Sequence, residues 1–175
     1  FSPSTLVLDA PFVIDQGEGL KTWKPENYGK KFYGPSTLRT GIEKSRNLMT
    51  VRIAQKVGFD QISKITKDFG IYDDVPELLS VSLGAAETTL IKLTNAYCTF
   101  VNGGKKVTPI FIDRIQDRRG KTTFNADKRK CIGCKEISYL KDEIPLIQDD
   151  RKQIISSETA YQVTSMLEGV VKRGT

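Results

Sequence analysis

Apolar residues recur at helical spacing in five stretches of the chain. They predict helices over residues 36–44, 48–57, 89–101 and 157–172, and a further helix that Asp60 caps and Gly70 ends. In the second helix the apolar positions nearly circle the axis, from Leu48 to Val57, so we expect this helix to be deeply buried.

The remaining pattern predicts little β-structure. Residues 110–116 and 121–124 alternate around a turn at Asp117-Arg118-Arg119-Gly120 and indicate a β-hairpin. Residues 1–35 contain four prolines and read as irregular, with an extended run over 6–14, and residues 125–155 form a long charged loop. We therefore predict an α+β fold that is mostly helical and has a small antiparallel β part.

Composition excludes several classes of protein. The 175 residues carry 27 Lys and Arg against 21 Asp and Glu, interspersed, with 38% hydrophobic residues, so a disordered polyelectrolyte is excluded. The chain has no His, which excludes a Ser-His-Asp triad, a Cys-His dyad and a His-ligated metal site. No run of 18 apolar residues or signal-peptide pattern is present, and both ends suggest an excised fragment of a longer protein.

The three cysteines leave the compartment open. Cys98 lies in an apolar helical run and is expected to be a small core residue. Cys131 and Cys134 have CxxC spacing in a polar loop, which is compatible with a local disulfide or idle thiols, an intermolecular metal site or a redox function.

Two short matches do not support a function. Gly120-Lys121-Thr122 lacks the glycine of a phosphate-binding loop, because Ile115 stands at that position, and it lies in a hairpin turn. The basic clusters favour solvated loops over a nucleic-acid surface, since no recognition motif accompanies them; a surface that meets an anionic polymer is the alternative. These clusters are Lys30-Lys31, Lys105-Lys106, Arg118-Arg119 and Lys128-Arg129-Lys130.

A third match, Ser45-Arg46-Asn47, lies in the joint between two predicted helices. An SxN triplet is common by chance, and Asn47 also stands where the second helix needs an N-cap. In an extended link, however, Ser45 and Asn47 can point into one cleft while Arg46 points away. A hydroxyl and an amide fixed in this way suit proton transfer and substrate orientation in a histidine-free acyl transferase.

Longer stretches carry a family likeness around this triplet. In chain order they are Trp23-Lys24-Pro25-Glu26-Asn27-Tyr28, Tyr33-Gly34-Pro35-Ser36-Thr37-Leu38-Arg39, Lys44-Ser45-Arg46-Asn47, Ser82-Leu83-Gly84-Ala85-Ala86-Glu87, Ala96-Tyr97-Cys98-Thr99-Phe100-Val101-Asn102-Gly103-Gly104 and Met166-Leu167-Glu168-Gly169-Val170-Val171. Together they resemble the transpeptidase domain of bifunctional (class A) penicillin-binding proteins, across essentially the whole chain. The resemblance implies the fold shared by penicillin-binding proteins and serine β-lactamases.

The family uses three motifs around one cleft: SxxK with the nucleophile, SxN, and K[ST]G on a strand. The resemblance implies that Ser45 relays a proton to the leaving group and that Asn47 holds the peptide or the β-lactam side chain. Neither of the other motifs lies in residues 1–175, which are expected to be the central part of the domain. Ser138-Tyr139-Leu140-Lys141 fits SxxK by letter only, and neither Lys21-Thr22-Trp23 nor Lys172-Arg173-Gly174 fits K[ST]G.

The resemblance also implies partners and a location. The parent protein is expected to bind peptidoglycan stem peptides ending in D-Ala-D-Ala, and β-lactams, without cofactor, metal or nucleic acid. It is expected on the periplasmic side of the inner membrane, anchored outside this chain, where Cys131 and Cys134 could pair. The sequence does not indicate an oligomeric state.

Two further expectations concern the isolated chain and the alternatives. The 175 residues alone are expected to be inactive and to fold marginally or expose apolar surface through Leu48, Ile53 and Val57. The alternatives to an enzyme are a cell-envelope scaffold with a relict transpeptidase fold and a basic nucleic-acid-binding module.

Overall fold

The computed structural model describes residues 1–15, 22–129, 131–132 and 146–174. Their elements form a helical body with three separate two-stranded antiparallel sheets, so the fold is α+β as predicted. In chain order the elements are β1 (Leu6–Asp9), β2 (Gly34–Thr37), α1 (Leu38–Glu43), α2 (Asn47–Val57), α3 (Phe59–Asp68), the 3-10 helix η1 (Leu79–Leu83), α4 (Leu90–Val101), β3 (Arg114–Gln116), β4 (Thr122–Asn125), β5 (Cys131–Ile132), β6 (Leu146–Ile147) and α5 (Ser157–Arg173).

All five predicted helices are present, with two corrected beginnings. The first helix begins at Leu38 because Ser36 and Thr37 pair with β1, and the Thr37 hydroxyl then caps the helix by accepting from the Thr40 N–H. Asp60 does not cap the third helix, and that prediction is wrong. Gly58, with φ +87°, both ends α2 and precedes α3, so Asp60 already lies in the first turn of α3.

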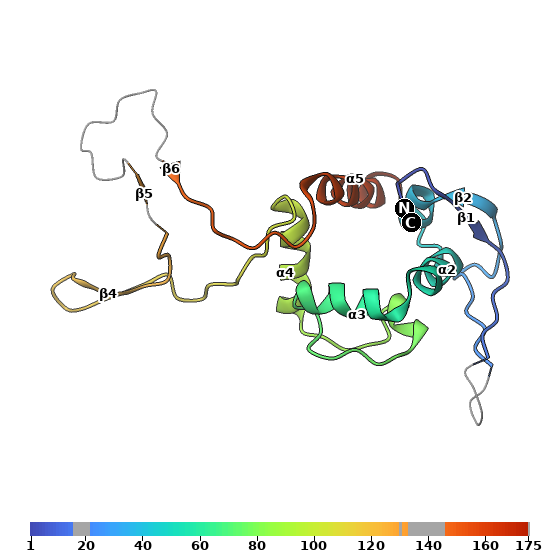
Figure 1. Cartoon of the computed structure of the whole chain (residues 1–175), viewed down its shortest axis with the longest axis horizontal. Coiled ribbons are helices and arrows are strands. Elements are labelled where there is room, and N and C mark those ends of the chain that lie inside the picture. Colours follow the sequence, from blue (N-terminus) through green and yellow to red (C-terminus); the bar gives the residue numbers. More distant parts are fainter. Residues whose placement is uncertain (16–21, 130, 133–145, 175) are drawn as a thin grey trace.

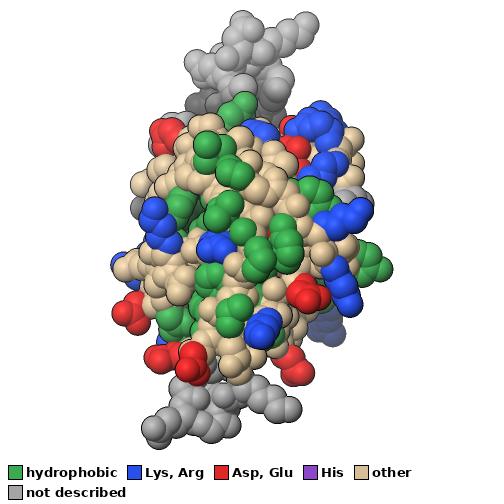
Figure 2. Space-filling view, turned by 90° about the vertical axis from the view of Figure 1, so that its right-hand side faces the viewer, with side chains coloured by type: hydrophobic (Ala, Val, Ile, Leu, Met, Phe, Trp, Pro, Cys, Tyr) green, Lys and Arg blue, Asp and Glu red, His purple; other side chains and the backbone are tan. Residues whose placement is uncertain are grey.

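The β-structure differs from the prediction at the N-terminus. Part of the stretch predicted as irregular forms β1, which pairs with β2 from Leu6 opposite Thr37 to Asp9 opposite Gly34. The end of the molecule that carries β1 and β2 shows apolar side chains among Lys and Arg (Figure 2). Leu6 and Leu8 are exposed, whereas Asp9 is fully buried.

The predicted hairpin is present as β3 and β4 but begins at Arg114 rather than at residue 110. It belongs to an arm that projects from the helical body (Figure 1). Residues 105–129 of this region contain eight Lys or Arg and three Asp, a net charge of +5 (8 − 3) out of +6 for the whole chain. Residues 130–150 contain three Lys and five Asp or Glu, a net charge of −2, so residues 1–104 and 151–175 together carry +3. Residues 105–129 are therefore a positively charged stretch of the chain.

The second helix is deeply buried, as predicted. Leu48 and Val51 of α2 are both 0% exposed and pack with Phe12 in the core, against which Ile14, Trp23 and Leu79 lie. The expectation that Leu48 is exposed is therefore wrong. Val57, at the end of α2, is exposed.

Exposed apolar surface lies instead on α4 and α5. Leu90, Leu93, Tyr97 and Val101 of α4 are exposed, and the buried side of this helix carries Ala96 and Thr99. An apolar groove of about 460 Å³ runs between α4 and α5, lined by Tyr97, Phe100, Val101, Thr164, Leu167, Glu168, Val170 and Val171. Cys98 is exposed with this face, so its predicted core position is wrong. Cys134 lies outside the described residues, as do the side chain of Cys131 and residues 138–141.

Residues 26–31, which lie between β1 and β2, are held by the buried amide of Asn27. Nδ2 of Asn27 donates to both carboxylate oxygens of Asp9, at 2.8 and 3.0 Å, and to the carbonyl of Lys31 at 2.9 Å. Its Oδ1 accepts from the N–H of Leu48 at 3.4 Å. Asn27 therefore joins β1, its own loop and the first turn of α2.

We expect Asn27→Ala to lower the free energy of unfolding of the complete protein by about 2–3 kcal/mol, because it removes the amide that donates to both oxygens of a buried carboxylate. Urea denaturation measures this change. Asn125→Ala, which removes one hydrogen bond on the exposed hairpin, is the matched control and should cost less than about 0.5 kcal/mol. Equal effects of the two substitutions would contradict the role of Asn27.

We expect residues 1–175 alone to bind the dye ANS through the exposed face of α4. Replacing Leu90 and Val101, 82% and 79% exposed, by Lys should lower the dye fluorescence at least about twofold while the helical circular dichroism is kept. Tyr28→Lys, at an exposed position on the loop between β1 and β2, should leave it unchanged. A chain that binds no dye would contradict this prediction.

Candidate functional site

The turn between α1 and α2 holds Ser45 in an unusual backbone conformation. Ser45 has φ +51°, in the left-handed region that normally favours glycine. Its N–H donates to the carbonyl of Ile42 at 3.1 Å, and the N–H of Arg46 donates to the carbonyl of Gly41 at 2.8 Å. These two bonds form the Schellman motif that ends α1, with serine in place of the usual glycine. The turn thus exposes Ser45 on a fixed but strained backbone.

Close packing of the two helices supports this turn. Gly41 faces Met49 of α2, and a Cβ built on Gly41 would lie 2.8 Å from the Met49 Cε atom. Both residues are buried. A side chain at position 41 would therefore force Met49 to move and change how α1 meets α2.

Arg46, between the two candidate residues, is fixed by an aromatic contact. Its guanidinium carbon lies 3.3 Å from the centre of the Tyr33 ring, close enough for a cation–π interaction. Its backbone is extended, with φ −82° and ψ 100°, as the N-cap of α2. The link between Ser45 and Asn47 is therefore held from its middle residue.

Asn47 is the first residue of α2 and does not cap it. Its Nδ2 donates to the carbonyl of Glu26 at 2.9 Å, and the N-cap residue, Arg46, makes no side-chain capping bond. The first turn of α2 instead receives Asn27 Oδ1 at the Leu48 N–H. The interpretation of Asn47 as a helix cap is therefore wrong, and the side chain is oriented by a loop 21 residues upstream.

The supporting residues Glu26, Asn27 and Tyr33 were not identified as part of a site from the residues themselves. Glu26 supports the turn through its carbonyl, Asn27 through its buried amide and Tyr33 through its ring. No local spacing in the sequence connects these residues with the SxN triplet. Lys172-Arg173-Gly174 lies at the end of helix α5 rather than on a strand, in keeping with its rejection as a K[ST]G motif.

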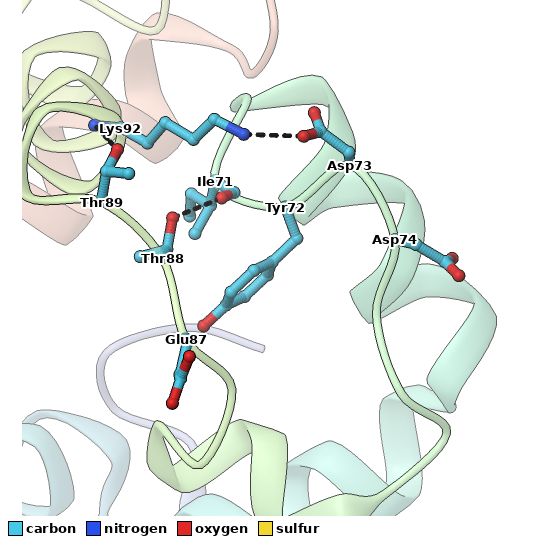
Figure 3. A pocket seen from close by; sticks show the side chains of 8 residues that line it. All are labelled: Ile71, Tyr72, Asp73, Asp74, Glu87, Thr88, Thr89 and Lys92. Carbon is cyan, nitrogen blue, oxygen red and sulfur yellow. Dashed lines mark hydrogen bonds and ion pairs between the residues drawn. The ribbon is translucent and has the colours of Figure 1, made fainter.

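A second candidate is the pocket of about 450 Å³ between the end of α3 and the beginning of α4 (Figure 3). Its polar groups fix the loop: Lys92 Nζ donates to Asp73 at 2.8 Å, Thr88 to the Ile71 carbonyl at 2.6 Å, and Tyr72 to the Ala86 carbonyl at 3.0 Å. The hydrogen bond from Lys92 lowers the pKa of Asp73. Figure 3 shows Asp74 pointing away from the pocket. The arrangement joins α3 to α4, and the ion pair between Lys92 and Asp73 holds the loop.

The described part of the chain contains no group of three or more Cys, Asp or Glu residues that could hold a metal ion. In the same part, no helix is long and apolar enough to cross a bilayer.

Comparison with known proteins gives one family. The family model described as "Penicillin binding protein transpeptidase domain" matches residues 1–175. Penicillin-binding protein 1A of Rickettsia bellii is 45% identical over 177 residues, covering 99% of this chain and 22% of that protein. The crystal structure of penicillin-binding protein 1A from Haemophilus influenzae has a TM-score of 0.80 and 30% identity, covering 99% of this chain and 27% of that one.

A more distant structure shares the fold. PonA1 of Mycobacterium tuberculosis in complex with penicillin V has a TM-score of 0.74 at 18% identity, and the match covers 99% of this chain and 43% of that one. The chain thus spans about 22% of the length of the Rickettsia relative.

The strain at Ser45 predicts that a glycine variant is more stable than an alanine variant at this position, the reverse of their order inside a helix. We expect Ser45→Gly to be more stable than Ser45→Ala by about 1 kcal/mol, because glycine adopts the left-handed conformation without steric cost. Urea unfolding of the complete protein measures the difference. At Ser63, inside α3, the order should be reversed, with alanine favoured over glycine by about 1 kcal/mol. The same order at both positions would contradict strain at Ser45.

Proposed function

Because the chain belongs to the family of penicillin-binding protein transpeptidase domains, we propose that it is the central part of the transpeptidase domain of a peptidoglycan D,D-transpeptidase. The observation that carries this proposal is the family match over all 175 residues. The proposed protein cross-links stem peptides by serine acyl transfer and is acylated by β-lactams. As in class A proteins, it would also carry a glycosyltransferase domain outside this chain.

The proposed reaction begins at a serine of an SxxK motif that precedes residue 1. The serine oxygen attacks the carbonyl of the penultimate D-Ala, the bond to the terminal D-Ala nitrogen breaks, and the serine becomes acylated. The Lys of the same motif accepts the proton of the attacking serine, and Ser45 is proposed to relay a proton to the leaving amine. In a β-lactam the ring nitrogen takes the place of this leaving amine, so both substrates would use the same relay.

The geometry of the turn supports these roles. Ser45 is exposed, with its backbone fixed by two hydrogen bonds, so its hydroxyl is presented at a defined place. The bond from Asn47 to Glu26 uses its Nδ2 group and orients the amide, so that Oδ1 can accept a hydrogen bond from a peptide or a β-lactam side chain. A K[ST]G strand that follows this chain would bind the substrate carboxylate.

The proposed partners are stem peptides ending in D-Ala-D-Ala, and β-lactams. Binding of penicillin V by a protein of the same fold, PonA1, supports the second. The positive arm over residues 105–129 complements the carboxylates of a glycan–peptide mesh. We place the protein in the cell envelope, on the periplasmic side of the inner membrane, with its anchor outside this chain.

Fluorescent-penicillin labelling of the complete protein tests the proposal. We expect covalent labelling of the wild type and an acylation rate at least about 100-fold lower in Ser45→Ala and Asn47→Ala, since each removes a group from a catalytic unit. Ser45→Gly should lose the rate equally although it relieves the backbone strain. Residues 1–175 alone are the negative control and should gain no mass from an opened β-lactam.

The other outcomes have distinct meanings. Labelling at the wild-type rate in both alanine variants would keep the family but remove Ser45 and Asn47 from the mechanism. A well-folded protein without any labelling would overturn the enzymatic proposal in favour of an envelope scaffold.

A further inference from the structure

Two helices far apart in the sequence are joined, next to the candidate turn, by a partly buried ion pair between a buried glutamate and an exposed arginine. Glu43 is the last residue of α1 and is 8% exposed, and Arg173 is the last residue of α5. Nη2 of Arg173 lies 2.6 Å from Oε1 of Glu43, and its Nε lies 3.3 Å from Oε2. The contact is therefore a two-pronged guanidinium–carboxylate pair, the geometry in which such pairs are strongest.

A glycine in α5 makes room for this carboxylate. A Cβ built on Gly169 would lie 2.0 Å from Oε1 of Glu43 and 2.8 Å from Nη2 of Arg173. Glycine destabilises a helix interior relative to alanine, so its presence here indicates a specific packing requirement. We call Glu43, Gly169 and Arg173 the α1–α5 clasp.

Neighbouring bonds align the two helices along the same seam. Arg39, one turn before Glu43, donates to the carbonyl and the hydroxyl of Ser165, at 3.1 and 3.2 Å. Lys44 donates to the carbonyl of Arg173. The last turn of α1 is thus held from several positions by a helix more than 120 residues away.

The hydrogen bond from Arg173 lowers the pKa of Glu43 below its ordinary value, so the pair is charged at neutral pH. If Arg173 were lost, the buried carboxylate would keep only a longer contact, with Arg39 Nη1 at 3.5 Å from Oε1. The two residues therefore depend on each other to keep this end of α1 in place.

Ser45 lies two residues after Glu43, on a backbone that needs support to remain left-handed. We propose that Glu43 and Arg173 are positioning residues, which hold the end of α1 so that the turn presents the Ser45 hydroxyl to the reacting atoms. This inference rests on the proposed function, because its effect is exerted through the proton relay at Ser45.

The test is pre-steady-state acylation of the complete protein by a chromogenic penicillin, which separates the non-covalent dissociation constant from the acylation rate constant. We expect Glu43→Gln and Gly169→Ala each to lower the rate constant about tenfold or more while the dissociation constant and the final labelled fraction are kept. Gly169→Ala displaces the carboxylate without removing a charge, so it decides the question if Glu43→Gln fails to fold.

Glu168→Gln is the matched control. Glu168 belongs to the same end of α5 but pairs with Lys172 on the exposed side, so its loss should change the rate constant less than twofold.

A second readout separates positioning from general support of the fold. In a Ser45→Ala background the relay is absent, so adding Glu43→Gln should change the residual acylation rate less than twofold. If the clasp only supports the fold, Glu43→Gln should lower the acylation rate constant by the same factor in the Ser45→Ala background as in the wild type.

Three outcomes overturn the inference. If Glu43→Gln and Gly169→Ala are acylated with the wild-type rate constant, the clasp has no positioning role. The proposed function then stands, because the wild type is still labelled. An equal loss of rate with and without Ser45 would show that the clasp does not act through the relay. Absence of labelling in the wild type would overturn the proposed function itself and the inference with it.

Discussion

The buried amide of Asn27 is the interaction on which the arrangement around the candidate turn depends. Helix α2 has no side-chain cap of its own, because its N-cap residue, Arg46, carries no hydrogen-bond acceptor, and its guanidinium lies over the Tyr33 ring. Asn27 satisfies the Leu48 N–H from outside the helix while its other end binds Asp9. Asn47 donates to the carbonyl of Glu26, the residue before Asn27. The same loop therefore fixes both the beginning of α2 and the amide of the SxN triplet.

The turn therefore lies between two independent supports. The loop over residues 26–33 holds the side that carries Arg46 and Asn47, and α5 holds the side that carries Glu43. Between them Ser45 has a conformation in which glycine would be more stable. Glycine occurs instead at positions 41 and 169, where a side chain would prevent close approach. Under the proposed function, the serine at position 45 gives up stability in exchange for a hydroxyl at the turn.

Local patterns in the sequence predicted the helices and the position of the turn well. Helical spacing and strand alternation are properties of neighbouring residues, so the five helices and the hairpin followed from them. The pairing of β1 with β2 did not, because it joins strands separated in the sequence by residues 10–33. For α4 the pattern showed that Tyr97 and Cys98 lie in an apolar helix but not which side the rest of the molecule covers, and both are exposed.

In the candidate site, too, the residues next to one another in the sequence could be predicted and the long-range contacts could not. Ser45 and Asn47 followed from their place between two helices and from the family resemblance. The support from Asn27, Tyr33 and Arg173 could not be predicted, because these contacts join residues up to 130 positions apart. Only the folded chain brings them together.

The separation of 130 residues between Glu43 and Arg173 also has a consequence for the order of folding. Contacts within and between successive helices close short loops and form early, whereas a contact across most of the chain carries a large loop-closure cost and forms late. During synthesis the turn with Ser45 leaves the ribosome long before α5 exists. A growing chain therefore contains the residues of the turn without its second support, and the geometry is completed only when α5 docks.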